Sequence, residues 1–169
     1  NLKSIAIQFD DIVATFDKQL QAVGGAELKR CDSIEEVITD VQKNYGNAKT
    51  YSEFADFGQP IKAETPQDYE ALEFALIKGA FGVAENGAIW NAFDDESKRA
   101  YPFLTQQLGI VIYEKDLVHN MDQAYKRVCS EELPPYGVFI SGPSKTADIE
   151  QCLVKGAHGA CELIVYLLP

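Results

Sequence analysis

The feature that most constrains the fold is an alternation of amphipathic helices with short strand-like segments near the start of the chain. Apolar residues in 9–23 recur at helical spacing, and a glycine pair ends this stripe. A short strand is expected at 27–31, followed by a helix that opens with a Ser33–Glu36 capping box and by a strand at 48–51. This strand–helix–strand order implies parallel pairing, with the helix crossing one face of the sheet.

A second pattern follows a polar, turn-rich stretch. Residues 72–93 are dense in apolar and aromatic side chains, and Asn86-Gly87 in their middle is a strong signal for a tight hairpin turn. The remaining pattern predicts helix 94–108, strand 108–113, a polar helix ending near 129, strand 137–140, helix 144–155 and strand 162–168. The sequence therefore predicts an α/β fold in one domain, with a mainly parallel sheet flanked by helices and an inserted antiparallel hairpin.

The charge balance argues against two classes of partner. The formal net charge of -11 at pH 7 would repel nucleic-acid backbones and anionic membranes. A small anionic ligand is still compatible with this net charge, because a local pocket can oppose the electrostatic field of the whole protein. No segment is long and apolar enough for a membrane span.

Cysteine usage favours a cytoplasmic protein with reduced thiols. The four cysteines include no C-x-x-C pair, so neither a zinc ribbon nor an iron–sulfur cluster is expected in this chain. Cys152 and Cys161 stand among apolar residues and are expected to fill the core. The start has no apolar signal-peptide core, although Asn1 in place of Met leaves room for a trimmed leader. Nothing in the sequence identifies a cofactor or a metal site.

The densest group of ligand-binding candidates lies around 140–150. An apolar strand breaks at Gly142-Pro143, and the helix expected at 144–155 would turn its free N–H groups and positive dipole end outward. Open α/β sheets bind ligands outside the carboxyl ends of their strands, where this loop is expected. The predicted ligand is a small carboxylate or phosphate. The residues expected to bind it are Ser141, Gly142, Ser144, Lys145, Thr146 and Asp148.

A purely structural explanation of the same residues has about equal weight. Ser144 or Thr146 would cap the helix, a role worth about 1 kcal/mol. Asp148 and Glu150 would complement the helix dipole and repel a bound anion. The segment has neither the G-x-G-x-x-G nor the G-x-x-x-x-G-K-[ST] spacing, so it indicates neither a dinucleotide site nor a P-loop.

Two further residues are candidates for proton transfer or nucleophilic catalysis. Glu85 precedes the expected turn among apolar neighbours, where burial would raise its pKa and suit it to acid–base or nucleophilic chemistry. The alternative is that the turn projects Glu85 into water. His158 lies between two small-residue pairs and has a side chain that titrates near neutral pH, but capping a helix end explains it equally well. A Ser-His-Asp triad drawn from these segments lacks the G-x-S-x-G elbow.

Together these segments resemble the lactate-utilisation LUD-domain family, the LutC/YkgG-like proteins. Residues 141–150, with 156–159 and 162–163, are similar to the C-terminal signature of that family. Residues 79–87 look like its central glycine–alanine–glutamate–glycine motif, and 21–25 look like the end of its opening helix. The resemblance covers nearly the whole chain, so residues 1–169 are expected to form a single LUD domain.

The resemblance implies a NagB/RpiA/CoA-transferase-like fold and a role in oxidising L-lactate to pyruvate, as a subunit beside iron–sulfur partner proteins. The chain departs from the family pattern in its shorter N-terminal region and at Ala160, where relatives usually carry proline. Residues 84–87 also resemble the Ser-Glu-Asn-Gly motif of class I CoA-transferases, whose glutamate forms a thioester with CoA. That likeness makes acyl transfer through Glu85 an alternative, although the glycine-rich oxyanion loop of those enzymes is not evident. A non-catalytic ligand-binding module is the third alternative.

Overall fold

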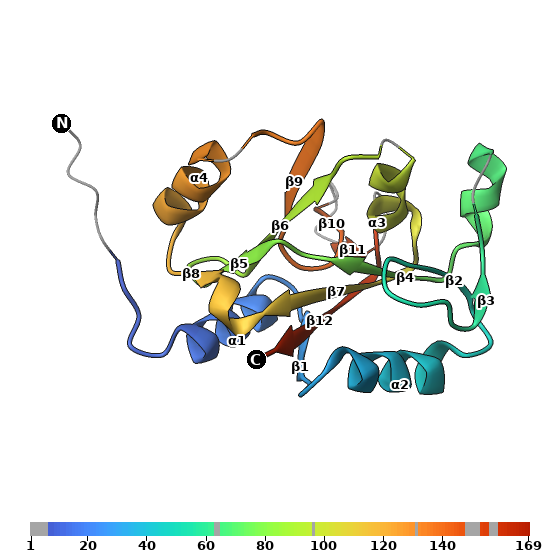
Figure 1. The fold of residues 1–169 in the computed structure, drawn as a ribbon, viewed down its shortest axis with the longest axis horizontal. Coiled ribbons are helices and arrows are strands. Elements are labelled where there is room, and N and C mark those ends of the chain that lie inside the picture. The colour runs from blue at the N-terminus through green and yellow to red at the C-terminus, as the bar shows by residue number, and fades with distance from the viewer. Residues whose placement is uncertain (1–6, 63–64, 96, 131, 148–152, 156–158) are drawn as a thin grey trace.

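A parallel sheet runs through the middle of the molecule (Figure 1). The computed structural model describes residues 7–62, 65–95, 97–130, 132–147, 153–155 and 159–169. Within them the parallel sheet has six strands, in the order β1 (Glu27–Arg30), β12 (Glu162–Leu168), β7 (Gln107–Tyr113), β4 (Phe74–Lys78), β2 (Lys49–Ser52) and β3 (Gln59–Pro60). Each neighbouring pair of these strands is parallel.

A smaller mixed sheet lies against the parallel one. Its described strands have the order β8 (Leu117–Val118), β5 (Phe81–Val83), β6 (Ala88–Phe93) and β9 (Tyr136–Ile140). Strands β5 and β6 pair antiparallel on either side of the predicted Asn86-Gly87 turn, where Gly87 has φ +66°. The antiparallel hairpin predicted from the sequence is thus confirmed.

The described part of the chain has four α-helices: α1 (Ile12–Ala22), α2 (Ile34–Tyr45), α3 (Tyr101–Leu104) and α4 (Met121–Ser130). Short 3-10 turns lie at η1 (Pro66–Ala71), η2 (Lys98–Ala100) and η3 (Glu114–Asp116). Ser33 is the N-cap of helix α2, and its hydroxyl accepts from the N–H of Glu36 at 3.3 Å. The Glu36 carboxylate closes the same end from the other side by accepting from the N–H of Asp32.

Alternating side chains on the central strands divide the interior into layers. Along β12, Leu163, Val165 and Leu167 pack into one core, whereas Ile164, Tyr166 and Leu168 pack into another. The first core contains α1 and the inner residues of the mixed sheet, and the second contains α2. Helix α4 packs on the outer face of the mixed sheet through Ala124. The order of layers is therefore α2, parallel sheet, α1 with the mixed sheet, and α4 (Figure 1).

The expected direct pairing of the first two strands is wrong. Strands β1 and β2 are parallel members of one sheet, but β12, β7 and β4 lie between them. The reason is hydrophobic: β1 reads Glu-Leu-Lys-Arg and β2 reads Lys-Thr-Tyr-Ser, whereas the inserted strands are almost wholly apolar. A strand buried on both faces needs apolar side chains on both, so the later strands take the centre.

The expected helix at 144–155 is also wrong. Its described residues form an antiparallel pair, β10 (Lys145–Ala147) and β11 (Leu153–Lys155), with Lys145 opposite Lys155. The short apolar run 152–154 is compatible with either a helix or a strand, and only the tertiary context decides between them. The helix expected at 94–108 is limited to η2 and α3, because the chain becomes extended at Thr105 and β7 starts at Gln107.

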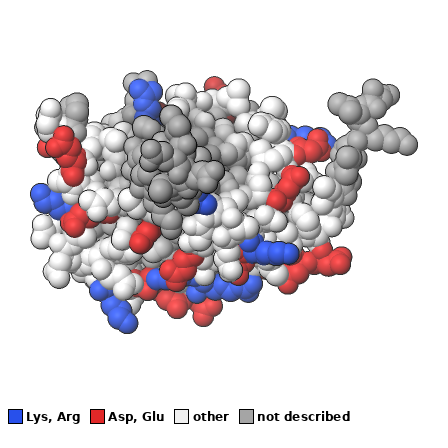
Figure 2. Space-filling model, turned by 180° about the vertical axis from the view of Figure 1, so that it is seen from behind, with Lys and Arg blue, Asp and Glu red and all other residues white. Residues whose placement is uncertain are grey.

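Positive and negative side chains are mixed on the face of the molecule that Figure 2 shows. On the face opposite to that of Figure 1, Lys and Arg side chains alternate with Asp and Glu along the lower edge (Figure 2). Among the residues placed by the structure, no helix has the length and apolar character needed to cross a membrane.

Candidate functional site

Three segments that are far apart in the sequence meet at the C-terminal end of α1. A Cβ added at Gly87 would lie 3.0 Å from the backbone N of Leu20, so the hairpin turn sits directly against this helix. A Cβ at Gly142 would lie 2.8 Å from the carbonyl O of Val23, so the loop after β9 touches the last turn of the same helix. Both close approaches require glycine, and both glycines have positive φ, +66° at Gly87 and +75° at Gly142.

Hydrogen bonds hold the same three segments together. The Ser141 hydroxyl donates to the carbonyl O of Asn86 at 2.8 Å, which joins the loop to the hairpin turn. The Lys145 ammonium donates to the carbonyl O of Val23 and so joins the loop to the end of α1. The backbone N of Ser144 donates to the carbonyl O of Ala160 at 2.8 Å, which ties the loop to the segment leading into β12.

A cavity of about 300 Å³ lies beside this junction. Its polar lining residues are Ser144 and Lys145, and Gly159 and Ala160 also line it. Its other walls are apolar and come from Pro102, Phe103, Leu108, Phe139 and Ile140. Lys145 is the charged residue of this lining, and its ammonium lies close by, at the end of α1, where it donates to Val23. A lysine beside an apolar cavity suits a small carboxylate that carries an apolar group.

The structure brings together most of the predicted ligand-binding residues. Ser141 and Lys145 are exposed, Ser144 is half-buried and Gly142 is buried in the loop. Thr146 belongs to β10. Asp148 and His158 lie outside the described residues, as does Cys152.

The physical basis predicted for anion binding is wrong in two respects. Residues 145–147 form a strand, so the loop does not present a helix N-terminus. The loop follows β9 of the mixed sheet, and it lies at the amino edge of the parallel sheet rather than at the carboxyl edge. Pro143 there shares a cavity of about 530 Å³ with Glu27, Gln107 and Glu162, the first residues of β1, β7 and β12. Cys161 lines that cavity and is exposed, so it does not fill the core as predicted.

Glu85 is exposed on the hairpin turn, which agrees with the alternative that the turn projects it into water. Its carboxylate accepts from the backbone N of Met121 at 2.9 Å, at the first residue of α4. Asn120 caps the same end, because its side-chain oxygen accepts from the N–H of Gln123 at 3.0 Å. Glu85 thus satisfies a free N–H and places negative charge at the positive end of α4.

Replacing Glu85 by Gln is expected to lower the free energy of unfolding by about 0.5–1 kcal/mol, because the amide keeps an acceptor and loses the charge at the helix end. Glu85→Ala, which removes both, is expected to cost about 1 kcal/mol. Urea denaturation measures both values, with the exposed Glu70→Gln as control. Equal stability of Glu85→Ala and wild type would contradict the capping role.

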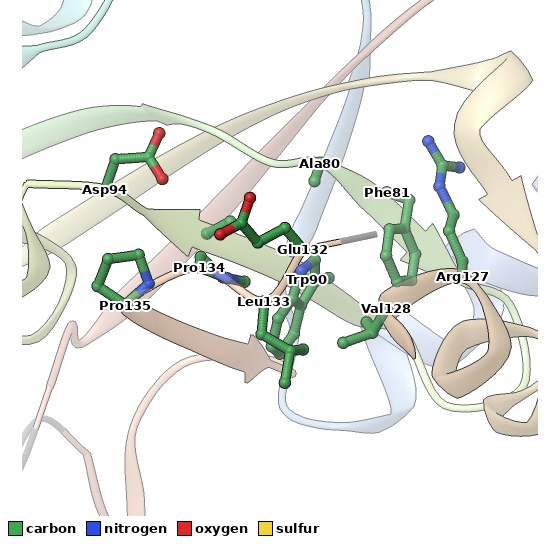
Figure 3. A pocket seen from close by; sticks show the side chains of 11 residues that line it. Ala80, Phe81, Trp90, Asp94, Arg127, Val128, Glu132, Leu133, Pro134 and Pro135 are labelled. Carbon is green, nitrogen blue, oxygen red and sulfur yellow. The ribbon is translucent and has the colours of Figure 1, made fainter. Parts of the chain in front are cut away.

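A further cavity, which the sequence pattern does not predict, lies at the opposite edge of the parallel sheet. It has a volume of about 490 Å³ and is lined by Ala80, Phe81, Trp90, Ala92, Asp94, Arg127, Val128, Glu132, Leu133, Pro134 and Pro135 (Figure 3). Ala80 follows the carboxyl end of β4 after one residue. The available signals were the lone tryptophan of the chain and the Pro134-Pro135 loop, and nothing in the local pattern connected them.

Comparison with known proteins agrees with this architecture. The family model of the LUD domain matches residues 42–168. A crystal structure of a DUF162 family protein from Deinococcus radiodurans superposes with a TM-score of 0.65 at 15% identity, covering 94% of this chain and 96% of that one. This likeness confirms the predicted fold class.

Curated relatives carry the name lactate utilization protein C. The protein from Oceanobacillus iheyensis is 25% identical over 88% of this chain and 70% of its own length. The one from Macrococcus caseolyticus is 27% identical over 76% of this chain and 64% of its own length, and the one from Bacillus pumilus is 35% identical over 59% and 43%. The similarity thus spans only part of each relative. Because the family model covers most of the chain, the chain belongs to the LUD domain family.

Proposed function

We propose that this protein takes part in lactate utilisation, as a cytoplasmic subunit of a system that oxidises L-lactate to pyruvate beside iron–sulfur partner proteins. Membership of the LUD domain family and the relatives named lactate utilization protein C support this proposal. The role proposed for this subunit is to hold a small anion, a carboxylate or phosphate, beside the junction at the end of α1.

The observation that carries the proposed site is the meeting of the end of α1, the hairpin turn and the Ser141 loop. Lys145 would supply the positive charge: its ammonium has three protons, and the Val23 carbonyl accepts one of them. Ser144 lines the same cavity, and Leu108 and Ile140 offer an apolar wall to a methyl group. Ser141, Gly142 and Thr146 would shape the loop.

Proton transfer in the proposed site is assigned to two residues. His158 immediately precedes Gly159, which lines the cavity, and it is the first candidate. Glu85 belongs to the turn that Ser141 touches through Asn86, although its carboxylate faces α4. The position of Glu85 gives no added support to acyl transfer through a glutamyl thioester.

Lys145→Ala is expected to weaken lactate or pyruvate binding about tenfold, because one charge-assisted hydrogen bond is worth more than 1 kcal/mol. Ligand-induced thermal stabilisation measures this effect, with inorganic phosphate as a second probe. Lys43→Ala is the matched control, since Lys43 is an exposed lysine on α2, across the parallel sheet.

A genetic test distinguishes the proposed anion site from the proposed role in lactate utilisation. Deleting the gene should abolish growth on lactate, and the Lys43→Ala protein should restore it while Lys145→Ala restores it poorly. Affinity capture of the tagged wild type should recover iron–sulfur proteins. Normal growth of the deletion strain would overturn the role in lactate utilisation, whereas equal ligand binding by both lysine variants would overturn only the anion site.

A further inference from the structure

The cavity of about 490 Å³ described above lies where the chain leaves the parallel sheet for the mixed one. Strand β4 ends at Lys78, and β5 starts at Phe81 in the other sheet. Ligands of open α/β sheets gather outside the carboxyl ends of strands at such changes of topology. An adjoining cavity of about 310 Å³ shares Ala80 and Ala92 with it. The charged residues that line this adjoining cavity are Glu53, Lys78 and Lys98, so the acidic lining belongs to the larger of the two cavities.

The cavity has an aromatic floor. Trp90 and Phe81 pair across β5 and β6, and both line the cavity. Phe139 of β9 packs against Trp90, with ring centroids 4.7 Å apart. Gly137 makes room for the indole, because a Cβ there would lie 2.3 Å from two of its ring carbons. The indole is therefore held against β9 and remains half-buried, with part of its surface accessible.

The acidic residues that line this cavity are unpaired, whereas its arginine is paired. Asp94 and Glu132 are exposed, and neither carboxylate has a hydrogen bond or ion pair with another described residue. Arg127 lies at the far end of the cavity, beyond Phe81 (Figure 3), and its guanidinium already has two interaction partners. It binds the carboxylate of Asp116 at 2.7 Å and lies 4.9 Å from the centroid of the Phe81 ring. Asp94 and Glu132 are therefore the charged lining residues of this cavity that have no described ionic partner.

We propose that this cavity binds an organic cation, an ammonium or guanidinium group that carries an apolar or planar body. The body would lie on Trp90 and between Leu133 and Val128, and the cationic group would lie close to Glu132 and Asp94 (Figure 3). Aromatic faces attract cations, tryptophan most strongly, and unpaired carboxylates add charge-assisted hydrogen bonds. The net charge of -11 favours a cation over an anion at long range as well.

This inference goes beyond the proposed function and does not depend on it. The anion site uses Lys145 at the amino edge of the parallel sheet, whereas the cation site uses acidic residues at the carboxyl edge. The same cationic chemistry belongs to a free amine and to a lysine side chain of a partner protein. The experiment distinguishes these two sources.

Trp90 is the only tryptophan in the chain, so intrinsic fluorescence reports on this cavity directly. Benzylammonium is the free-amine probe, N-acetyl-lysine methylamide is the side-chain probe, and benzyl alcohol is the neutral match at constant ionic strength. We expect saturable fluorescence change with benzylammonium at a Kd at least tenfold lower than with benzyl alcohol. Tighter binding of the lysine probe than of benzylammonium would assign the cation to a partner protein.

Asp94→Asn with Glu132→Gln is expected to weaken benzylammonium binding about tenfold and leave benzyl alcohol binding unchanged. Asp56→Asn with Glu70→Gln removes two exposed carboxylates that do not line this cavity and is the matched control. Trp90→Leu should abolish binding measured by ligand-detected NMR, with circular dichroism to verify its fold. Equal binding of the amine and the alcohol, or an unchanged Kd in the Asp94/Glu132 variant, would overturn the proposal.

Discussion

Replacing Phe16 by Ala is expected to lower the free energy of unfolding by about 3–5 kcal/mol, the usual cost of removing a buried phenylalanine ring. Phe16 is 0% exposed and belongs to the core between the parallel and the mixed sheet. Its ring lies against Gly82 of β5, where an added Cβ would come within 3.1 Å of two ring carbons. The ring thus fills space that β5 leaves open, and few neighbours are free to move into the cavity left by its removal.

Urea denaturation monitored by circular dichroism measures this loss. Lys18→Ala on the same helix is the matched control, because Lys18 is exposed, and its effect should stay within about 0.5 kcal/mol. A loss below 1 kcal/mol for Phe16→Ala would mean that α1 is not held between the two sheets. Since the end of α1 carries the Lys145 contact and both close glycine approaches, the variant is also expected to loosen the proposed anion site.

The sequence predicted the elements whose signal is local and strong. The apolar runs at β4, β7 and β12 are those of strands buried on both faces, and the structure places these strands at the centre of the parallel sheet. The Asn86-Gly87 turn was equally readable, because a positive φ at Gly87 is a property of the turn itself. Local chemistry was sufficient in these cases.

The order of strands and the edge occupied by the loop were not local properties. Strand β1 pairs with β12, and the two are separated by most of the chain. The Ser141 loop was assigned to a carboxyl edge because it follows a strand, but that strand, β9, belongs to the mixed sheet. Likewise, the sequence leaves Glu85 either buried among its apolar neighbours or exposed on the turn, and the structure exposes it with its carboxylate at the start of α4.

Two different kinds of observation indicate candidate sites at the two edges of the parallel sheet. The segment 141–150, which resembles the family signature, indicates a site at the amino edge, where Lys145 and the two glycine contacts meet the end of α1. Topology indicates the carboxyl edge, where Trp90 and two carboxylates line a separate cavity. A protein with both sites would hold an anion and a cation on opposite edges of one sheet, so the two binding tests should give independent results.

Replacing Asp40 by Ala is expected to cost about 2 kcal/mol of stability, since it removes the acceptor of a buried hydroxyl. The Tyr166 hydroxyl and the Lys29 ammonium both donate to Asp40, each at 2.8 Å, so one carboxylate of α2 joins β12 and β1. Tyr166 is 0% exposed, and its hydroxyl would have no described partner without Asp40. The Lys29–Asp40 ion pair is partly exposed and contributes less.

A double-mutant cycle separates the contribution of the hydroxyl from that of the charge. In a Tyr166→Phe background, Asp40→Ala should cost about 1 kcal/mol less than in the wild type, because no hydroxyl is then left unsatisfied. Additive losses in this double-mutant cycle would contradict the coupling of the two groups.

The pH dependence of stability provides an independent test. Burial by itself would raise the pKa of Asp40, but hydrogen bonds from Lys29 and Tyr166 outweigh burial and lower it. The folded protein therefore binds fewer protons at this carboxyl than the unfolded chain, whose aspartate pKa is about 3.9. The contribution of Asp40 is complete above that pH and is lost as the pH falls through the lower folded pKa.

We expect the stability difference between wild type and Asp40→Asn to be constant from about pH 5 to pH 7 and to shrink below about pH 4, as measured by urea denaturation at each pH. A difference that stays constant down to pH 2.5 would show that the charge of Asp40 does not stabilise the fold.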